Sequence, residues 1–492
     1  MQKISVKTIY LILVISIGLV GLGVGSTFAM FTASSKIDNP ISFTARIFGE
    51  SDVIETVEVT VPAGETKATN LHVTNSTNSN LNYVMWYIDE GLDIELGSKR
   101  TDSGTYQTTI DAGEEHKYEV SIRNNSSSSV TVVIGVSSGT GSVTLSSDMK
   151  MVPQSELKLK PTLASVITNL YNNSTKTAVP NNSITYQYDT TNNLMKDTAG
   201  NIRYYWASPN NYVYFNCDSY PSTNCELWRI IGVFDGKIKL IRNKTIGLYS
   251  WDNKNKSTGA ETAYGKNDWT TARLMKLLNP STYYTTDAND NGKGQSLYWN
   301  ATSGACYSGQ NNATISCNFT STGIKNDTTR NMIAETTWNL GGWDTSEIFS
   351  NEMYEKERGT TTVSNPSDGI TRATTWTGKI ALPYPSDYGY ATDLSKCSQT
   401  LFNYNSGTDS YACRSNDWMY SIITNSGIND GWLLTPFSGF AYFAFGVDSP
   451  GYVNGYGVYA AFMVAPVLYL GSDQDIVSGD GSQSNPYQLA NS

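Results

Sequence analysis

The sequence predicts a multi-domain, β-rich protein with an N-terminal export or membrane segment, an all-β sandwich and an α+β domain. An uncharged apolar stretch at residues 9–31 lies near the start of the chain of 492 residues. Alternating and β-branched segments without cysteine follow it, and the remainder holds every cysteine and every tryptophan except Trp86. A chain of this length exceeds one compact core, so two or three domains are expected.

The N-terminal segment predicts export. Lys3 and Lys7 precede an uncharged apolar run at residues 9–31, and the next charge is Lys36. A basic segment before a hydrophobic one inserts with its lysines in the cytoplasm, so the rest of the chain is expected outside. Residues 1–33 are therefore predicted to be either a signal peptide or a single transmembrane anchor.

Composition restricts the possible partners. The formal net charge is −10, which argues against nucleic acid and anionic lipid because each requires a basic face. Charged residues make up only 16% of the chain and aromatic residues 12%. Such a chain can bury a sizeable core beneath an uncharged polar surface.

Residues 34–152 are predicted to form an Ig-like β-sandwich. Segments such as 57–61, 81–87 and 130–136 alternate in polarity or consist of β-branched residues, and turn signals such as Pro62-Ala-Gly64 separate them. This rhythm is typical of an antiparallel sandwich.

Residues 153–182 are predicted to be a polar linker, with a short helix at 157–170 as an open alternative. Residues 183–492 are predicted to be an α+β domain. Extended segments precede helices such as 269–279, and Tyr- and Gly-rich strands at 431–470 close the domain.

The cysteines lie in close pairs. Six thiols permit fifteen pairings, but an even number outside the membrane and short spacings favour neighbour disulfides. The expected pairs are Cys217 with Cys225, Cys306 with Cys317, and Cys397 with Cys413. No pair has the CxxC spacing of a zinc or redox site, so we predict no metal and no cofactor.

Two family resemblances add to this interpretation. Residues 25–36, leading into Ile41-Ser-Phe-Thr-Ala-Arg46, resemble the export signals of the biofilm-matrix and camelysin-like proteins of Gram-positive bacteria. This resemblance implies cleavage before or within Ala29-Met30-Phe31. It also implies a β-sandwich in the first quarter of the chain.

The second resemblance spans residues from about 200 to 470. Glu226-Leu-Trp-Arg-Ile-Ile-Gly232, Pro385-Ser-Asp-Tyr388 and Trp432-Leu-Leu-Thr-Pro436 resemble, in this order, a family of uncharacterised bacterial surface domains. That family is similar to C-type-lectin-like and formylglycine-generating-enzyme-like folds. The resemblance implies a C-type-lectin-like fold, and it is weak for function because function lies in sites grafted on folds.

Residues 439–448 and 451–462 are the best candidate for a recognition surface. Tyr and Phe supply large contact areas at low entropic cost, and Asn and Asp offer hydrogen bonds. The predicted ligand-binding residues are Phe440, Tyr442, Phe445, Asp448, Tyr452, Asn454, Tyr456 and Tyr459. Two alternatives stay open: these aromatic residues fill a sheet core, or the segment is a diversified cassette like those of some C-type-lectin-like proteins.

Catalysis is not expected. The only two histidines, His72 and His116, lie in the predicted sandwich. The large domain therefore has no histidine for a Ser-His-Asp triad or a zinc-protease motif. A secreted hydrolase that uses Asp387 and Asp393 is a weaker alternative.

Together these features predict an adhesin-like protein, secreted or at the cell surface. Its lectin-like domain is expected to bind an extracellular glycan or protein, with the membrane as a further partner where the N-terminal segment is retained. The main alternative is a structural matrix or filament protein that assembles through the sandwich by strand exchange or edge pairing.

Overall fold

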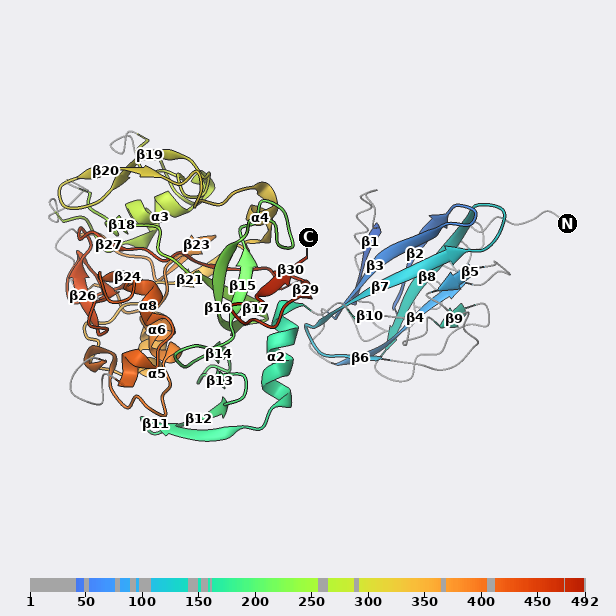
Figure 1. The fold of residues 1–492 in the computed structure, drawn as a ribbon, viewed down its shortest axis with the longest axis horizontal. Coiled ribbons are helices and arrows are strands. Elements are labelled where there is room, and N and C mark those ends of the chain that lie inside the picture. Colours follow the sequence, from blue (N-terminus) through green and yellow to red (C-terminus); the bar gives the residue numbers. More distant parts are fainter. Residues whose placement is uncertain are drawn as a thin grey trace, which may run out of the picture. The chain divides into compact units, whose positions relative to one another are not determined.

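A computed structural model of the chain divides it into two compact units, Met1–Lys160 and Pro161–Ser492 (Figure 1). The residues that the structure describes are 41–47, 53–75, 80–88, 94–96, 108–139, 149–151, 158–159, 162–254, 264–286, 292–363, 369–404, 412–472 and 474–490. The predicted export segment 1–33 lies outside these ranges. Within them, no helix has the length and apolarity needed to cross a membrane.

The first unit consists of two five-stranded sheets. One sheet has the order β1 (Ile41–Ile47), β3 (Thr66–Asn75), β7 (Glu115–Asn124) and β10 (Lys158–Leu159), and β5 (Ile94–Leu96) also pairs with β7. The other has the order β2 (Val53–Val61), β8 (Val130–Gly139), β4 (Leu81–Ile88) and β6 (Thr108–Ile110), and β9 (Met149–Met151) also pairs with β4. Strand β1 runs parallel to β3, whereas β2 runs antiparallel to β8.

Both sheets contribute to one core. Val59 of β2, Val73 of β3 and Val120 of β7 belong to the same buried cluster. Along β2, the exposed Glu58 and Thr60 alternate with buried valines, as a strand with one buried face requires. The prediction of a β-rich first unit is confirmed.

The second unit is built on an eleven-stranded sheet. Its main path runs β11 (Thr177–Asn181), β12 (Ile184–Asp189), β13 (Leu194–Lys196), β14 (Ile202–Tyr204), β16 (Glu226–Phe234), β15 (Tyr212–Phe215), β30 (Tyr487–Leu489) and β29 (Ile476–Ser478). Strand β17 (Lys237–Arg242) joins β16 to β28 (Val467–Tyr469), which also pairs with β23 (Ile380–Ala381). Residues 228–234 of β16 are all buried, so this strand lies in the centre of the core.

A five-stranded sheet carries the C-terminal aromatic segment. Its order is β18 (Leu248–Tyr249), β27 (Phe462–Met463), β24 (Gly431–Pro436), β25 (Phe443–Val447) and β26 (Val453–Gly457). Two hairpins complete the strands, β19 (Ser303–Tyr307) with β20 (Thr314–Asn318) and β21 (Thr336–Asn339) with β22 (Thr375–Gly378).

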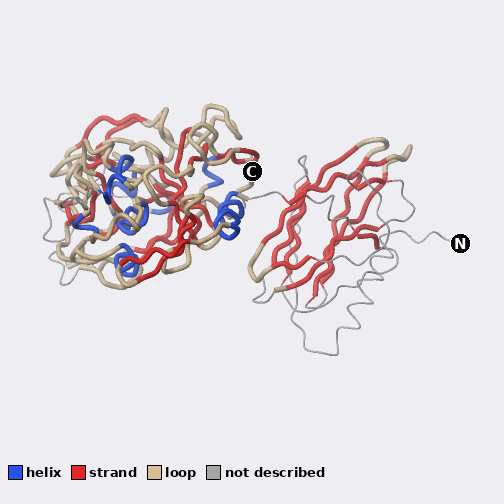
Figure 2. Tube along the Cα trace, turned by 60° about the horizontal axis from the view of Figure 1, so that its bottom comes forward, coloured by secondary structure: helices blue, strands red, loops and turns tan. Residues whose placement is uncertain are grey.

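Helices are short and lie among the strands of this unit (Figure 2). The described α-helices include α2 (Leu163–Asn173), α3 (Arg273–Leu278), α4 (Asp327–Met332), α5 (Ser350–Glu357), α6 (Pro385–Ala391) and α8 (Tyr420–Ile423). The predicted helix at 269–279 is a 3-10 turn, η3 (Trp269–Thr271), followed by α3. Ala272 has an extended backbone between the two elements, which ends the 3-10 turn before α3 begins.

The prediction of a linker at 153–182 is corrected from residue 163 onward. The short helix expected at 157–170 is present as α2, strand β11 follows it, and the second unit begins at Pro161. Leu163, Ile167 and Tyr171 recur every four residues, so they share one face of α2, and all three belong to the main core. The segment is rich in Asn and Thr, as linkers often are, but the apolar face of α2 packs into the core of the second unit.

Three neighbour disulfides connect the six cysteines as predicted: Cys217–Cys225, Cys306–Cys317 and Cys397–Cys413. Disulfides persist in oxidising compartments outside the cytosol. The three bonds therefore indicate an extracellular or secreted protein.

Candidate ligand-binding surface

The loop between β24 and β25 places aromatic rings at the surface of the second unit. Phe440 is 51% exposed and Tyr264 41% exposed, which is unusual for such large apolar side chains in this protein. The rings that gather around them define what we call the aromatic surface: Tyr264, Phe437, Phe440, Tyr442, Phe443 and Tyr459.

Successive ring contacts run through this aromatic surface. The Tyr459 and Tyr264 ring centroids lie 5.2 Å apart, and those of Tyr264 and Tyr442 lie 5.3 Å apart. Tyr442 contacts Phe440 at 6.0 Å, and Phe440 contacts Phe437 at 6.2 Å. These spacings are typical of favourable aromatic pairs, so the rings support one another.

A buried asparagine fixes the backbone of this loop. The Asn267 side-chain amide donates to the carbonyl oxygens of Phe437, Phe440 and Phe443 at 3.0, 2.9 and 2.8 Å. Its backbone N–H donates to the Ala441 carbonyl at 2.9 Å. Asn267 therefore donates hydrogen bonds to four carbonyl oxygens in and beside this loop, and buried carbonyl oxygens require such donors.

Arg372 holds that asparagine in place. Its Nε donates to Asn267 Oδ1 at 2.7 Å, and its Nη2 donates to the Ala441 carbonyl at 2.8 Å. Both Arg372 and Asn267 are buried. Because the donors come from inside the protein, the loop has a defined shape before any ligand arrives.

Glycines allow the rings to lie close to the backbone. A Cβ atom at Gly455 would lie 2.6 Å from the Phe437 ring, and one at Gly439 would lie equally close to it. A Cβ at Gly457 would lie 2.4 Å from the Tyr459 ring. The alternation of glycine and aromatic residues in this segment thus has a packing cause.

The structure brings together three of the eight predicted ligand-binding residues, Phe440, Tyr442 and Tyr459. Phe445 is corrected: it is 0% exposed, because β25 is buried on both faces from Ala444 to Val447. Asp448 is corrected as well, since it is 5% exposed and serves the turn between β25 and β26. Its Oδ1 accepts from the Tyr452 N–H, and burial raises its pKa.

The remaining predicted residues form a second, half-buried group on and beside β26. The Tyr456 hydroxyl donates to Asp448 Oδ2 at 3.2 Å. The Tyr452 ring lies 5.8 Å from Phe402, and Asn454 Oδ1 accepts the N–H of Gly455. Hydrogen bonds within the protein occupy much of this group.

Sequence reasoning missed Tyr264, Phe437 and Phe443 as members of the aromatic surface, and Asn267 and Arg372 as their support. Phe443 lies inside the predicted segment 439–448 and Phe437 lies two residues before it, so its aromatic density was a usable signal for both. Tyr264, Asn267 and Arg372 lie far from it in the chain, and no local pattern points to them.

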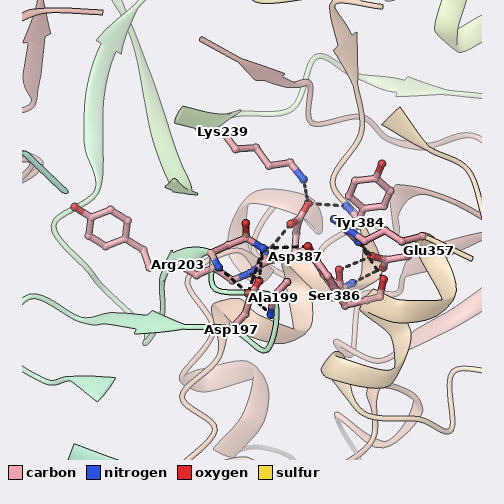
Figure 3. Close-up of polar contacts among 12 residues, drawn as sticks. Asp197, Ala199, Arg203, Lys239, Glu357, Tyr384, Ser386 and Asp387 are labelled. Atoms are coloured by element: carbon pink, nitrogen blue, oxygen red, sulfur yellow. Dashed lines mark hydrogen bonds and ion pairs between the residues drawn. The ribbon is translucent and has the colours of Figure 1, made fainter. Parts of the chain in front are cut away.

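A second polar cluster lies inside the core (Figure 3). Arg203 of β14 pairs through Nε with Asp197 at 2.6 Å and through Nη1 with Asp387 at 2.9 Å. Lys239 of β17 bonds the other Asp387 oxygen, which also accepts the Tyr384 N–H at 3.0 Å. All four charged side chains are at most 1% exposed.

Charge balance explains the ionisation of this cluster. Burial alone would raise the pKa of Asp387, but the Lys239 ammonium and the Arg203 guanidinium outweigh it and hold that pKa at about 2. Nearby, burial raises the pKa of Glu357 to about 7 although Arg358 and the Ser386 hydroxyl oppose it. Two anions and two cations thus neutralise each other away from solvent.

Both carboxylates of the hydrolase alternative have partners within the protein. Both Asp387 oxygens are engaged by cations in the core. Asp393 Oδ1 accepts the N–H of Ser395 in a turn. Among the described residues, no three His, Cys, Asp or Glu side chains gather as a metal site would require.

No protein-family model, curated protein or solved structure matches this chain.

Proposed function

We propose that this protein is an adhesin-like binding protein of the bacterial cell surface or the secreted fraction. Its second unit is proposed to be a C-type-lectin-like recognition domain that binds an extracellular glycan or protein. The first unit is proposed to be an Ig-like sandwich that carries it. The observation that supports the proposal is the aromatic surface, with Phe440 51% exposed on the clamped loop and Tyr264 41% exposed beside Tyr442.

Two exposed aromatic rings linked through the half-buried Tyr442 favour binding as their role. Folding normally buries such side chains, and contiguous apolar patches on soluble proteins mark interaction sites. Tyr and Phe have few rotatable bonds, so binding immobilises them at low entropic cost. The clamp formed by Asn267 and Arg372 reduces the cost further because the backbone is already ordered.

The predicted absence of catalysis stays part of the proposal. The pKa of Asp387 is lowered, and the cause is its ion pairs with Lys239 and Arg203. Perturbed pKa values occur in structural ion networks as well as in active sites. The buried cluster therefore supports the fold rather than a reaction.

The test compares variants of the labelled full-length protein on a glycan array and on intact cells. Phe440→Ala and Tyr264→Ala each remove an exposed ring. Ile428→Ala is the matched control, because Ile428 is an exposed apolar residue on the loop after α8, at 72%. Loss of a ring at the centre of an interface weakens binding by about tenfold or more.

We expect the two ring variants to lose binding while their melting temperatures and the control variant stay unchanged. Wild-type protein that binds no array spot and no cell would contradict the proposal. Equal binding by wild type and both ring variants would also contradict it.

A structural filament protein is the second candidate, and the edge strands of the first unit favour it. β2 and β1 stand at the ends of their sheets' strand orders. An outermost strand has one row of backbone groups available for another chain. Filaments seen by electron microscopy after dilution would support this candidate, and a monomer in sedimentation would oppose it.

A further inference from the structure

The aromatic surface also restricts the class of ligand, an inference that rests on the proposed function. We infer that it binds a single chain of a neutral polysaccharide, with sugar rings stacked along the row Tyr459, Tyr264, Tyr442 and Phe440. Three observations support this inference: the continuity of the row, the tilt between its rings and the burial of the charges beside it.

The row is longer than one ring. Its centroids follow one another at 5.2, 5.3 and 6.0 Å. Each aromatic face carries partial negative charge that attracts the C–H groups of a sugar ring, and the tyrosine hydroxyls at Tyr264, Tyr442 and Tyr459 can accept or donate hydrogen bonds. A continuous row of such rings matches an elongated oligosaccharide rather than one sugar unit.

The tilt of the rings distinguishes a free chain from a flat crystalline surface. Interplanar angles along the row are 40° between Tyr459 and Tyr264, 28° between Tyr264 and Tyr442, and 48° between Tyr442 and Phe440. A flat polysaccharide crystal would require coplanar rings. Rings inclined to one another by 28° to 48° can instead meet the sugar units of one soluble chain, whose rings need not share a plane.

Charge argues for a neutral chain. None of the six residues of the aromatic surface carries a formal charge. Among the described neighbours in sequence, Lys266 and Asp268 are nearly buried and lie 3.9 Å apart, and Arg372 is buried against Asn267. An anionic glycan would meet no exposed cation from these residues, and the protein's net charge of −10 would repel it.

The experiment measures the full-length protein by native affinity electrophoresis in gels that contain one polysaccharide each. Neutral probes are a soluble β-glucan, a galactomannan and dextran. Hyaluronan and heparin are the anionic probes, and microcrystalline cellulose pull-down tests the flat surface. Trp206→Ala is the matched control, because Trp206 is 40% exposed, nearly the same as Tyr264, and is not part of the aromatic surface.

We expect at least one neutral soluble polysaccharide to retard the protein. Tyr264→Ala and Phe440→Ala should each weaken this binding by about tenfold or more, and Trp206→Ala should not. Phe440 is half exposed, so its variant keeps the core intact and tests the inference even where Tyr264→Ala fails to fold.

Three outcomes would overturn the inference. The first is retardation by the anionic probes alone, and the second is binding to cellulose without binding to any soluble neutral chain. In the third, cell binding depends on Phe440, resists competition by all neutral probes and disappears after protease treatment of the cells. That result would assign a protein ligand and leave the proposed function standing. If the ring variants bind every probe and every cell as wild type does, both the inference and the proposed function are rejected.

Discussion

Asp387 illustrates how much a single buried residue depends on its partners. Its carboxylate joins β14 to β17 through Arg203 and Lys239. Transfer of charges into a protein core costs several kcal/mol per ion, and the pair recovers this cost only when every charge is matched. The cluster is matched in charge, and removal of one member would leave an uncompensated ion.

We therefore expect Asp387→Asn to lower the free energy of unfolding by about 3 to 5 kcal/mol at neutral pH. Guanidinium denaturation measures this loss. The pKa of Asp387 is about 2 in the folded protein and has an ordinary value of 3.8. Its contribution is therefore complete above pH 3.8 and is lost as the pH falls towards 2.

The double variant Asp387→Asn/Lys239→Met is the matched control for this prediction. In the single variant the Lys239 ammonium is buried without its carboxylate partner. The double variant removes this charge as well, so it should recover part of the lost stability. Two results would contradict this prediction. The first is an Asp387→Asn variant as stable as wild type, and the second is a double variant no more stable than the single one.

Asp417 is a buried carboxylate with an incomplete set of partners. It is buried, its Oδ1 accepts from the N–H groups of Met419 and Tyr420, and its Oδ2 has no hydrogen-bond partner. Burial raises its pKa well above 3.8, and the two backbone hydrogen bonds oppose the shift only in part. Folding therefore favours the protonated form of Asp417 relative to the unfolded chain.

A raised carboxyl pKa has a defined effect on stability. The contribution of Asp417 is complete below pH 3.8 and is lost as the pH rises through its folded-state pKa. Asp417→Asn cannot ionise, so its stability relative to wild type should improve with pH above about 4, by at most about 1.4 kcal/mol per pH unit. Urea denaturation at several pH values checks this trend, with exposed Asp344→Asn as the control. A difference that does not change with pH would contradict it.

At the scale of elements, the segment from β24 to β26 combines core and surface in one short stretch. Phe445 of β25 is buried while the loop before it exposes Phe440. The antiparallel pairing of β25 with β26 places Gly455 opposite Phe445, and a Cβ atom at Gly455 would contact the Phe437 ring. Strand pairing therefore controls where the rings of the loop can lie.

Gly455→Ala should disturb the aromatic surface more than the fold. The added methyl group would lie 2.6 Å from the Phe437 ring, so this half-buried ring has to move, at a cost of about 1 to 3 kcal/mol. We expect near-ultraviolet circular dichroism to change and ligand binding to weaken by more than the stability loss explains. Gly359→Ala is the control because its Cβ would lie farther from the nearest atom, 3.3 Å from the Lys356 carbonyl oxygen, and Gly359 is not part of the aromatic surface. Unchanged binding by Gly455→Ala would exclude Phe437 from the supporting structure.

At the scale of the whole molecule, the boundary between the two units decides which segments each unit needs in order to fold. The second unit begins at Pro161, and α2 contributes Leu163, Ile167 and Tyr171 to its core. Each large apolar side chain contributes about 1.5 to 3 kcal/mol when fully buried. The total stability of a domain is about 5 to 15 kcal/mol, so the second unit depends on α2.

Two truncated proteins test this boundary. A protein of residues 161–492 should unfold cooperatively, whereas one of residues 183–492 lacks α2 and β11 and should be insoluble or melt at a much lower temperature. Thermal unfolding under oxidising conditions compares them. Equal melting temperatures would show that α2 is dispensable and that the predicted domain start at residue 183 is the functional one.

The sequence by itself determined what depends on short separations along the chain. Alternation of Glu58, Val59 and Thr60 specified a strand with one buried face, and spacings of 8 to 16 residues favoured the three neighbour disulfides. The density of aromatic residues near Phe440 marked the right segment, although strand periodicity there was insufficient to separate the exposed Phe440 from the buried Phe445.

Only the tertiary structure decided which distant residues meet. Tyr264 contacts Tyr442, Asn267 clamps the loop of Phe440, and Asp387 pairs with Arg203. These contacts join segments from separate elements, and their formation depends on strand order and core packing rather than on local spacing. Periodicity reports which face of an element is buried, and it carries no information about which other element covers that face.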